Sequence, residues 1–403
     1  MLIFRQIFVA ALRILLVGAC ALGAWSSWAI ARADYLFRQN TVSSIRASLQ
    51  WAPDNPAAYM RLAQLDESKA RQMLDTALRL DPYNAQANIE LGLLKEANGE
   101  TDAAEKLLLH AFEIDRTYTP RWSLANFYLR QGNLPAFWLW AHRAAEMPPD
   151  DMGALFALCW RVAPDPNTIA DAILNNNPST VRQFIVFLLA KNQLDAAVGL
   201  ATHLLQIGEP DRDRALLLSL VNQAIAANDV KASTEIWRGL VQKKWIVADV
   251  SVPNNPDFSR DPLPVGFDWT LSSQTGLHSW PGPAGLAVEL SGDQPESCTI
   301  AEQALALVPS NYTFHYSYRT TDIAPDTGIT WQILDAKSGS ILAESSSLSS
   351  DVMLGKTLNF TVPQGTSLLR LRLGYQRALG TTRVRGTLTI QSTIIRQIAS
   401  PQY

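Results

Sequence analysis

The amino-acid sequence predicts a multidomain protein built from one transmembrane helix at the N-terminus, an all-α solenoid and an all-β sandwich. Three observations support this prediction: an apolar run of membrane length near the start, alanines that recur at a fixed interval, and short alternating runs in the last third of the 403-residue chain. The expected boundaries are 1–33 for the transmembrane helix, 41–246 for the solenoid, 247–266 for a linker and 267–403 for the sandwich.

The N-terminal segment is basic and then apolar. Arg5 and Arg13 precede an uncharged run of about 18 residues that ends at Arg32, and this length crosses a bilayer as one helix. Basic residues on the leading side place the N-terminus in the cytoplasm. We therefore expect a membrane-anchored protein with the bulk of the chain outside the cytoplasm, in the periplasm or on the cell surface.

Two features of this segment indicate whether it stays attached after export. The apolar run is longer than the ~7–15 residues of a cleaved signal peptide, and Trp25 and Trp28 lie near its outer end, where indole rings favour the membrane interface. These features favour an uncleaved signal anchor. The alternatives are cleavage after Ala33, because residues 31–33 have the small-x-small form of a signal-peptidase site, and a lipoprotein box ending at Cys20.

Composition and motif content argue against several classes of function. A net charge of -3 argues against nucleic-acid binding. Cys20, Cys159 and Cys298 fall in different predicted parts, and the five histidines are scattered, so we expect neither a disulfide framework nor a metal site. The sequence has no phosphate-binding glycine-rich loop, nucleophile elbow or paired-histidine helix. We therefore expect a non-enzymatic protein without a cofactor.

Residues 41–246 have helical periodicity, and three alanines within them recur at a fixed interval. Ala77, Ala111 and Ala145 are each 34 residues apart, and this is the period of a repeat made of two antiparallel helices. Small residues at such positions let the helices approach closely, and larger ones would push them apart. Because one helical hairpin cannot bury its apolar face alone, several repeats must stack on one another.

The clearest unit spans 85–118, where Leu91-Gly92 opens the pattern, and Asp81-Pro82 closes the unit before it. These residues resemble the motif of the tetratricopeptide repeat (TPR) family. The resemblance implies a TPR-like solenoid that binds a protein partner. Three repeats are recognisable in this way, and two or three degenerate ones follow.

The first helices of TPR repeats line a groove that binds extended peptides or helices. By motif position, the groove candidates are Met60, Ile89, Leu93, Phe127 and Arg130. Family members that clamp a carboxylate use polar residues where this chain has Ile89 and Leu93. We therefore expect an apolar peptide or helix in the groove. The alternative is that these residues contact the next repeat.

The composition changes between 247 and 266, where prolines interrupt any helix. Beyond that point, short alternating runs replace the helical period, with examples at 312–318, 329–334 and 369–375. Turn clusters rich in Gly, Pro, Asp and Ser separate these runs. Several short strands at this spacing predict a β-sandwich.

The start of this domain carries a second resemblance. The sequence Asn-Pro-Asp-Phe at 255–258 and Trp269 in the first strand resemble the opening of jelly-roll carbohydrate-binding modules. A last strand that pairs back near this start, at about 388–398, would agree with that fold. The resemblance implies a galactose-binding-like sandwich with a polysaccharide as its ligand, although many such sandwiches bind no sugar and serve structurally.

Two sets of side chains are candidates for binding a glycan or an anion. Trp280, in a Gly/Pro-rich loop, either stacks on a sugar ring or anchors its loop. Arg370 and Arg372 alternate with leucines, and Arg383 and Arg385 flank a valine. If the two strands pair, four guanidinium groups share one face of a sheet. That face then needs either acidic neighbours from other strands or an anionic ligand.

Two functions of different classes agree with these observations. The first is a membrane-anchored, extracytoplasmic TPR scaffold for protein–protein interactions, which by analogy would act in exopolysaccharide or cell-envelope assembly. The second is a glycan-binding protein in which the sandwich holds polysaccharide and the solenoid is a spacer.

Overall fold

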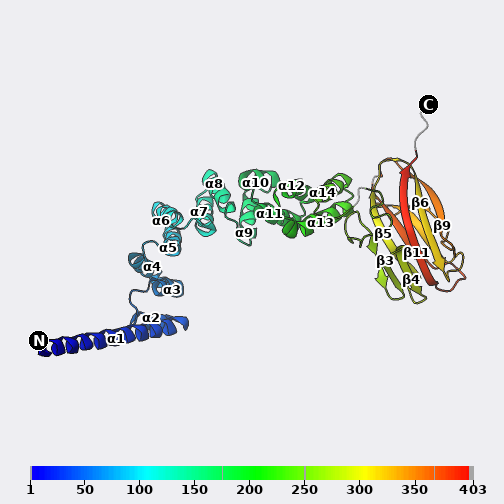
Figure 1. Ribbon diagram of the computed structural model, residues 1–403. Coiled ribbons are helices and arrows are strands. Elements are labelled where there is room, and N and C mark those ends of the chain that lie inside the picture. Colours follow the sequence, from blue (N-terminus) through cyan, green and yellow to red (C-terminus); the bar gives the residue numbers. More distant parts are fainter. Residues whose placement is uncertain (1, 175, 249–250, 367, 399–403) are drawn as a thin grey trace. The chain divides into compact units, whose positions relative to one another are not determined.

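The computed structural model describes residues 2–174, 176–248, 251–366 and 368–398. Side chains are described from Arg13 onward, so that of Arg5 lies outside the described residues. The chain divides into two compact units, Met1–Asn175 and Asn176–Tyr403. Figure 1 shows the predicted order of parts: an N-terminal apolar helix, an all-α region and an all-β sandwich. This prediction of fold class is confirmed.

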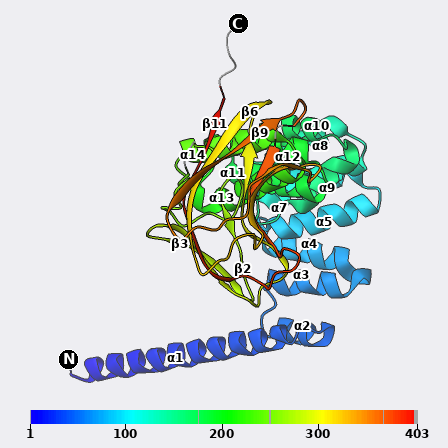
Figure 2. The same cartoon turned by 90° about the vertical axis from the view of Figure 1, so that its right-hand side faces the viewer.

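The first unit begins with one long helix, α1 (Leu2–Arg38). Among the described residues, its stretch Arg13–Arg38 is the one helix long and apolar enough to cross a membrane, and none of its 18-residue apolar window is buried within the protein. The helix continues without a break beyond its apolar part, and α2 lies beside its C-terminal end in both Figure 1 and Figure 2.

Paired helices make up the rest of the first unit, and α3–α4, α5–α6 and α7–α8 pack as hairpins. The helices are α2 (Val42–Leu49), α3 (Pro56–Leu65), α4 (Ala70–Leu80), α5 (Ala85–Ala97), α6 (Thr101–Ile114), α7 (Tyr118–Arg130), α8 (Leu134–Ala145), α9 (Gly153–Val162) and α10 (Pro166–Ile173), with a 3-10 turn, η1 (Glu67–Lys69), before α4.

The first helices of the repeats begin at similar polar caps. The side chains of Asn55 and Asn84 accept hydrogen bonds from the first-turn amides of α3 and α5. A cap of this kind stabilises a helix by about 1 kcal/mol. The second helices carry the periodic alanines: Ala77, Ala111 and Ala145 are fully buried. The 34-residue interval therefore marks helix–helix contacts, as predicted.

The second unit begins with two further helical hairpins, which lack the motif residues but keep the geometry. Asn192 and Asn228 form the turns within them, with φ of 57° and 58°, a left-handed conformation that the short asparagine side chain tolerates. The helices are α11 (Pro178–Ala190), α12 (Leu194–Ile207), α13 (Pro210–Ala226) and α14 (Val230–Gln242).

The sandwich consists of two antiparallel sheets. Within the described residues, one has the strand order β1-β5-β10-β7-β8 and is called the β10 sheet, and the other has the order β2-β3-β4-β11-β6-β9 and is called the β11 sheet. The strands are β1 (Thr270–Leu271), β2 (Ser273–Gln274), β3 (Leu277–Gly282), β4 (Gly285–Ser291), β5 (Ser297–Ala306), β6 (Ser310–Thr321), β7 (Ile329–Asp335), β8 (Ile341–Glu344), β9 (Leu354–Val362), β10 (Leu368–Gln376) and β11 (Arg385–Gln397).

Aromatic rings fill the space between the two sheets. Trp269 and Trp331 are fully buried, with ring centroids 6.1 Å apart, and Phe258 lies 4.9 Å from Trp269. Phe314 on the β11 sheet meets the Trp331 ring edge-on at 5.2 Å. Rings of this size bury 150–250 Å² each and dominate the stability of such a core. The last strand, β11, pairs with β4 near the start of the domain, as expected.

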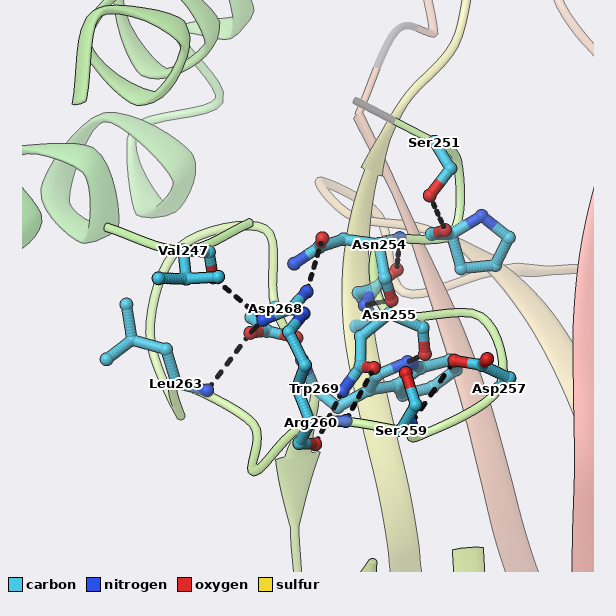
Figure 3. A network of polar contacts seen from close by, with 12 residues as sticks. Val247, Ser251, Asn254, Asn255, Asp257, Ser259, Arg260, Leu263, Asp268 and Trp269 are labelled. Carbon is cyan, nitrogen blue, oxygen red and sulfur yellow. Dashed lines mark hydrogen bonds and ion pairs between the residues drawn. The ribbon is translucent and has the colours of Figure 1, made fainter. Parts of the chain in front are cut away.

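The segment before the first strand is hydrogen-bonded to the sandwich. Asn254 N donates to Gln303 Oε1 at 2.9 Å, and Gln303 Nε2 donates back to Asn254 O at 2.9 Å. Trp269 Nε1 donates to Asn255 O at 3.2 Å. Figure 3 shows these asparagines beside Arg260, whose guanidinium lies 3.8 Å from Asp268. A linker over 247–266 stays a prediction, but residues 254–256 are in contact with the sandwich.

Candidate binding surfaces

Two of the five groove candidates lie inside the helical region. Phe127 is 1% exposed and Ile89 is similarly buried. Neither side chain is accessible to a peptide in this conformation, in line with the alternative that they contact neighbouring helices, and their part in a groove stays a prediction. Motif position identifies the face of a helix, but the degree of burial depends on how the neighbouring helices pack, and here they cover both side chains.

The other candidates are partly accessible. Leu93 is 40% exposed and presents an apolar surface on α5. Met60 on α3 is half-buried and packs against the cluster of Ala63, Leu74 and Leu91. The accessible apolar area of the expected groove is therefore small and centred on Leu93.

A polar row crosses the first helices instead. It consists of Asn40, Arg61, Gln64, Glu90 and Gln86. Arg61 Nε donates to Asn40 Oδ1 at 2.6 Å, and Arg61 Nη1 donates to Gln64 Oε1 at 2.7 Å. Glu90 Oε1 then accepts from Gln64 Nε2 at 2.7 Å and Gln86 Nε2 at 3.0 Å. These groups are exposed and join α3 to α5, so a ligand on this surface meets amides and charges beside Leu93.

Arg130 is held by a carboxylate of the preceding repeat. Its Nε and Nη2 donate to the two oxygens of Glu96 at 2.9 and 2.7 Å, and Gln131 Nε2 adds a third contact at 3.1 Å. This two-point geometry is the one that guanidinium uses for any carboxylate. A ligand carboxylate would have to displace Glu96 to reach Arg130.

The outer face of the β10 sheet carries a polar hollow of about 460 Å³, which we call the sheet trough. Its floor is Gly374, whose missing side chain leaves space between Thr299 and Thr330 on the neighbouring strands. Glu344 stands at one side, where its Oε1 accepts from Thr330 Oγ1 at 2.8 Å and Gln332 Nε2 at 3.0 Å. These residues were not among the candidates predicted from the sequence, although the alternation in 329–334 places Thr330 and Gln332 on one face.

Arg372 lines the trough on the other side. Its Nε lies 2.6 Å from Glu302 Oε2, and Arg370 Nη1 lies 3.4 Å from the other oxygen of the same carboxylate. Glu302 comes from β5, so an acidic neighbour from another strand balances the two arginines. This was one of the two outcomes expected for a face rich in like charges.

The four arginines do not share a face. Arg370 and Arg372 lie on β10, whereas Arg385 begins β11 and pairs with Ser291 in the opposite sheet. Arg383 precedes that strand and is exposed. The condition for a shared face, pairing of the two strands, is not met because the chain crosses from one sheet to the other between them.

Trp280 lies in a strand and not in a loop. It belongs to β3, is 37% exposed, and its ring stacks on His278 with centroids 4.8 Å apart. The face of this ring is therefore partly accessible to solvent. Because β3 is part of the β11 sheet, Trp280 and the sheet trough lie on different sheets of the sandwich.

A second hollow, of about 350 Å³, lies within the second unit, between α14 and β5. Trp237, Val241, Phe267 and Leu305 give it a mainly apolar lining, with Arg238 at its side. Sequence patterns could not reveal it because its walls come from distant segments. Among the described residues, no group of three or more His, Cys, Asp or Glu could hold a metal ion.

Residues 66–127 match the model of the tetratricopeptide repeat family. This region is therefore a TPR region, as the 34-residue period and the motif residues predicted. No curated protein matches the chain.

Three solved structures illustrate the similarities of the two kinds of fold. A CBM4 structure is 11% identical and covers 36% of this chain and 99% of its own, with a TM-score of 0.30. YrrB, a TPR protein with an unusual peptide-binding site, is 14% identical over 51% of this chain and 94% of its own, with a TM-score of 0.25. PilW, a type IV pilus biogenesis factor, is 16% identical over 54% and 92%, with a TM-score of 0.26.

Proposed function

We propose that the protein is a non-enzymatic scaffold that remains anchored in a membrane and holds a protein partner outside the cytoplasm on its TPR region. The observation that carries this proposal is the continuity of α1, which joins the apolar segment to the first repeat as one helix. The setting that we propose is exopolysaccharide or cell-envelope assembly, because a membrane anchor, a repeat region and a sandwich with a polar trough then serve one complex.

The packing of α1 supports retention of the anchor. Ala33, the last residue before the candidate cleavage point, is buried. The helix continues to Arg38, which pairs with Asp34 at 2.9 Å, and Phe37 packs on the cluster around Ile45 and Leu62. A chain that ended between Ala33 and Asp34 would therefore lose part of a packed helix. Mass spectrometry of the native N-terminus tests retention, and a chain that begins at Asp34 would contradict it.

The partner site that we propose is the surface formed by Leu93 and the polar row. An exposed leucine beside a bonded row of amides and charges suits a peptide that offers one apolar side chain and several hydrogen-bonding groups. The row is held by side chain–side chain hydrogen bonds, so less rotamer entropy is lost when a partner binds. This replaces the purely apolar ligand that the sequence favoured.

Site-specific photocrosslinking tests this surface. A photoreactive phenylalanine analogue is placed at Leu93, and at Leu139 on α8 as a matched control, because both leucines are exposed. We expect Leu93 to give a discrete crosslinked partner in membranes and Leu139 to give none. Equal products at both positions, or none at Leu93, would remove this surface from the function.

A second candidate function, glycan binding, is favoured by one feature, the sheet trough. Thr330, Gln332, Glu344 and Arg372 place hydroxyl, amide, carboxylate and guanidinium groups around an open glycine floor. A sugar hydroxyl can donate a hydrogen bond to a carboxylate and accept one from an amide or guanidinium group at the same time. Calorimetric titration with neutral and acidic polysaccharides tests it, with Gln332→Ala as the variant in the trough and Trp280→Ala as the control on the other sheet. Loss of binding only with Trp280→Ala would move the glycan site to the β11 sheet.

A further inference from the structure

Three tryptophans converge where the apolar part of α1 ends. Trp25 and Trp28 come from α1, with ring centroids 5.4 Å apart. Trp51 comes from the turn after α2, and its ring meets Trp28 edge-on at 4.9 Å and Trp25 at 6.3 Å. Although they touch one another, Trp25 and Trp28 remain 60% and 51% exposed. An exposed aromatic cluster built from two separate segments calls for a surface that covers it.

The position of this cluster along α1 corresponds to a membrane boundary. At 1.5 Å per residue, Trp28 stands about 22 Å from Arg13 and Arg32 about 28 Å, and the hydrocarbon core of a bilayer is about 30 Å thick. Most exposed apolar side chains of α1 lie between Ile14 and Ile30, and Arg32 and Arg38 lie beyond them, with Tyr35 between the two arginines. Indole rings favour the layer between hydrocarbon and headgroups, and arginines favour the phosphates next to it.

The course of α2 brings Trp51 back to the position of Trp25 and Trp28 along α1. Beyond Trp28, α1 continues for about 15 Å to Arg38. The chain then reverses at Asn40, whose φ is 54°, and the eight residues of α2 return along α1 for about 12 Å. The turn at Gln50 and Trp51 is thereby brought back beside the outer end of the apolar segment. Figure 2 shows α2 alongside this end of α1.

We propose that Trp25, Trp28 and Trp51 form a lipid-interface site, by which the turn after α2 is seated in the headgroup layer of the outer-facing leaflet. The inference rests on the proposed retention of α1 in the membrane and adds a second membrane contact made by the TPR region itself. The occupant is phospholipid and not a second protein, because the cluster is continuous with the exposed apolar side chains of α1 and is bordered by Arg32.

This site restricts the orientation of the first repeat. One helix crossing a bilayer leaves the attached domain free to tilt, whereas a second contact from α2 removes that freedom. The cost of exposing three indole rings to water is also removed when lipid covers them. The first repeat would therefore have a fixed orientation on the membrane.

The test uses the full-length protein in vesicles of phosphatidylcholine and phosphatidylglycerol, in a background with Cys20→Ala and Cys298→Ala. An environment-sensitive fluorophore is attached to Gln50→Cys, next to the intact Trp51, and in a second sample to Asn98→Cys. The two positions are matched, since both are exposed amide residues that follow the last turn of a helix, α2 and α5. Quenching by nitroxide lipids labelled near the headgroup or deep in the acyl chain is then measured.

We expect the headgroup nitroxide to quench the label at position 50 severalfold more strongly than the deep nitroxide, and severalfold more strongly than it quenches the label at position 98. Trp51→Glu in the same labelled protein should reduce this quenching to the level of position 98, while Trp51→Phe should retain most of it. Flotation of the vesicles reports separately whether α1 is inserted. Equal quenching at 50 and 98 in protein that floats with the vesicles would overturn the inference and leave the anchor intact. Protein that does not float would contradict the anchor itself.

Discussion

Glu96 and Arg130 stand 34 residues apart and are joined by two hydrogen bonds, of 2.9 and 2.7 Å. They occupy equivalent places on the first helices α5 and α7 of successive repeats. The repeat period therefore brings two side chains of opposite charge together, in addition to the small residues that let the helices approach. This ion pair joins neighbouring repeats near the surface, whereas the periodic alanines let helices pack closely in the core.

Replacing Arg130 by Ala should lower the free energy of unfolding by about 0.5–1 kcal/mol, because an ion pair with an accessible arginine is screened by solvent. Arg130→Lys should recover only part of this loss, since lysine cannot make both hydrogen bonds at once. Urea denaturation measures the change, with Arg79→Ala as the control, because Arg79 bonds only within its own helix at Thr76 among the contacts described. A larger loss with Arg79→Ala would contradict the assignment of an inter-repeat contact.

Gly92 and Gly199 should respond in opposite ways to alanine. A Cβ at Gly92 would lie 3.1 Å from Leu108 Cγ, whereas one at Gly199 meets nothing within 4 Å. Gly199→Ala should stabilise the protein by about 0.5–1 kcal/mol through its helix propensity. The free energy of unfolding of Gly92→Ala should be lower than that of Gly199→Ala by about 1 kcal/mol or more, because Leu108 must shift. Thermal denaturation of both variants checks this, and an equal gain at both sites would show that the α5–α6 contact is loose.

Glu100 should make stability depend on pH. The hydrogen bond from Lys95, followed by the charges of Arg71 and Lys95, lowers the pKa of Glu100 below its ordinary value of 4.5. A carboxyl with a lowered pKa in the folded state stabilises the protein above its unfolded pKa, and this contribution is lost as the pH falls through the folded pKa. The unfolding midpoints of the protein and Glu100→Gln should therefore differ at neutral pH and converge in acid. A difference that persists at the acid end would assign the effect to packing.

The two arginine pairs should act independently on an anionic ligand. Arg370→Ser with Arg372→Ser should weaken binding of an acidic polysaccharide at low salt, since both residues are next to the sheet trough. Arg383→Ser with Arg385→Ser should leave that binding unchanged, because these residues belong to the other sheet or its approach. Titration of the full chain at two salt concentrations checks this. Equal losses for the two pairs would indicate a diffuse charge effect.

The helical region was predictable from periodicity because each hairpin is held by contacts between residues that are close in the sequence. The buried alanines and the turn asparagines Asn192 and Asn228 each follow from contacts within one hairpin. The burial of Phe127 could not be predicted in the same way, since a motif position fixes only the helix face. The depth of that side chain depends on the packing of the next helix.

In the sandwich, too, the elements could be predicted from the sequence but not how they pack together. Strand positions were predictable from alternation, and the strands around Trp331 and Leu371 lie where alternation put them. The partners of each strand were not predictable, because β10 and β11 are neighbours in sequence and members of different sheets. The trough has Glu344 from β8 on one side and Arg372 from β10 on the other, with β7 between them, and only the strand order brings both residues to one hollow.

The unbroken course of α1 couples the apolar segment rigidly to the helices that follow it. Each residue of an α-helix advances the chain by 1.5 Å and turns it by about 100°. A single residue inserted between Gly18 and Gly23 would therefore rotate the helix beyond it, and α2 with it, through about a quarter of a circle relative to the N-terminal end of α1. If α1 is anchored as proposed, the length of the apolar segment sets both the direction in which the proposed partner surface faces and its height above the bilayer.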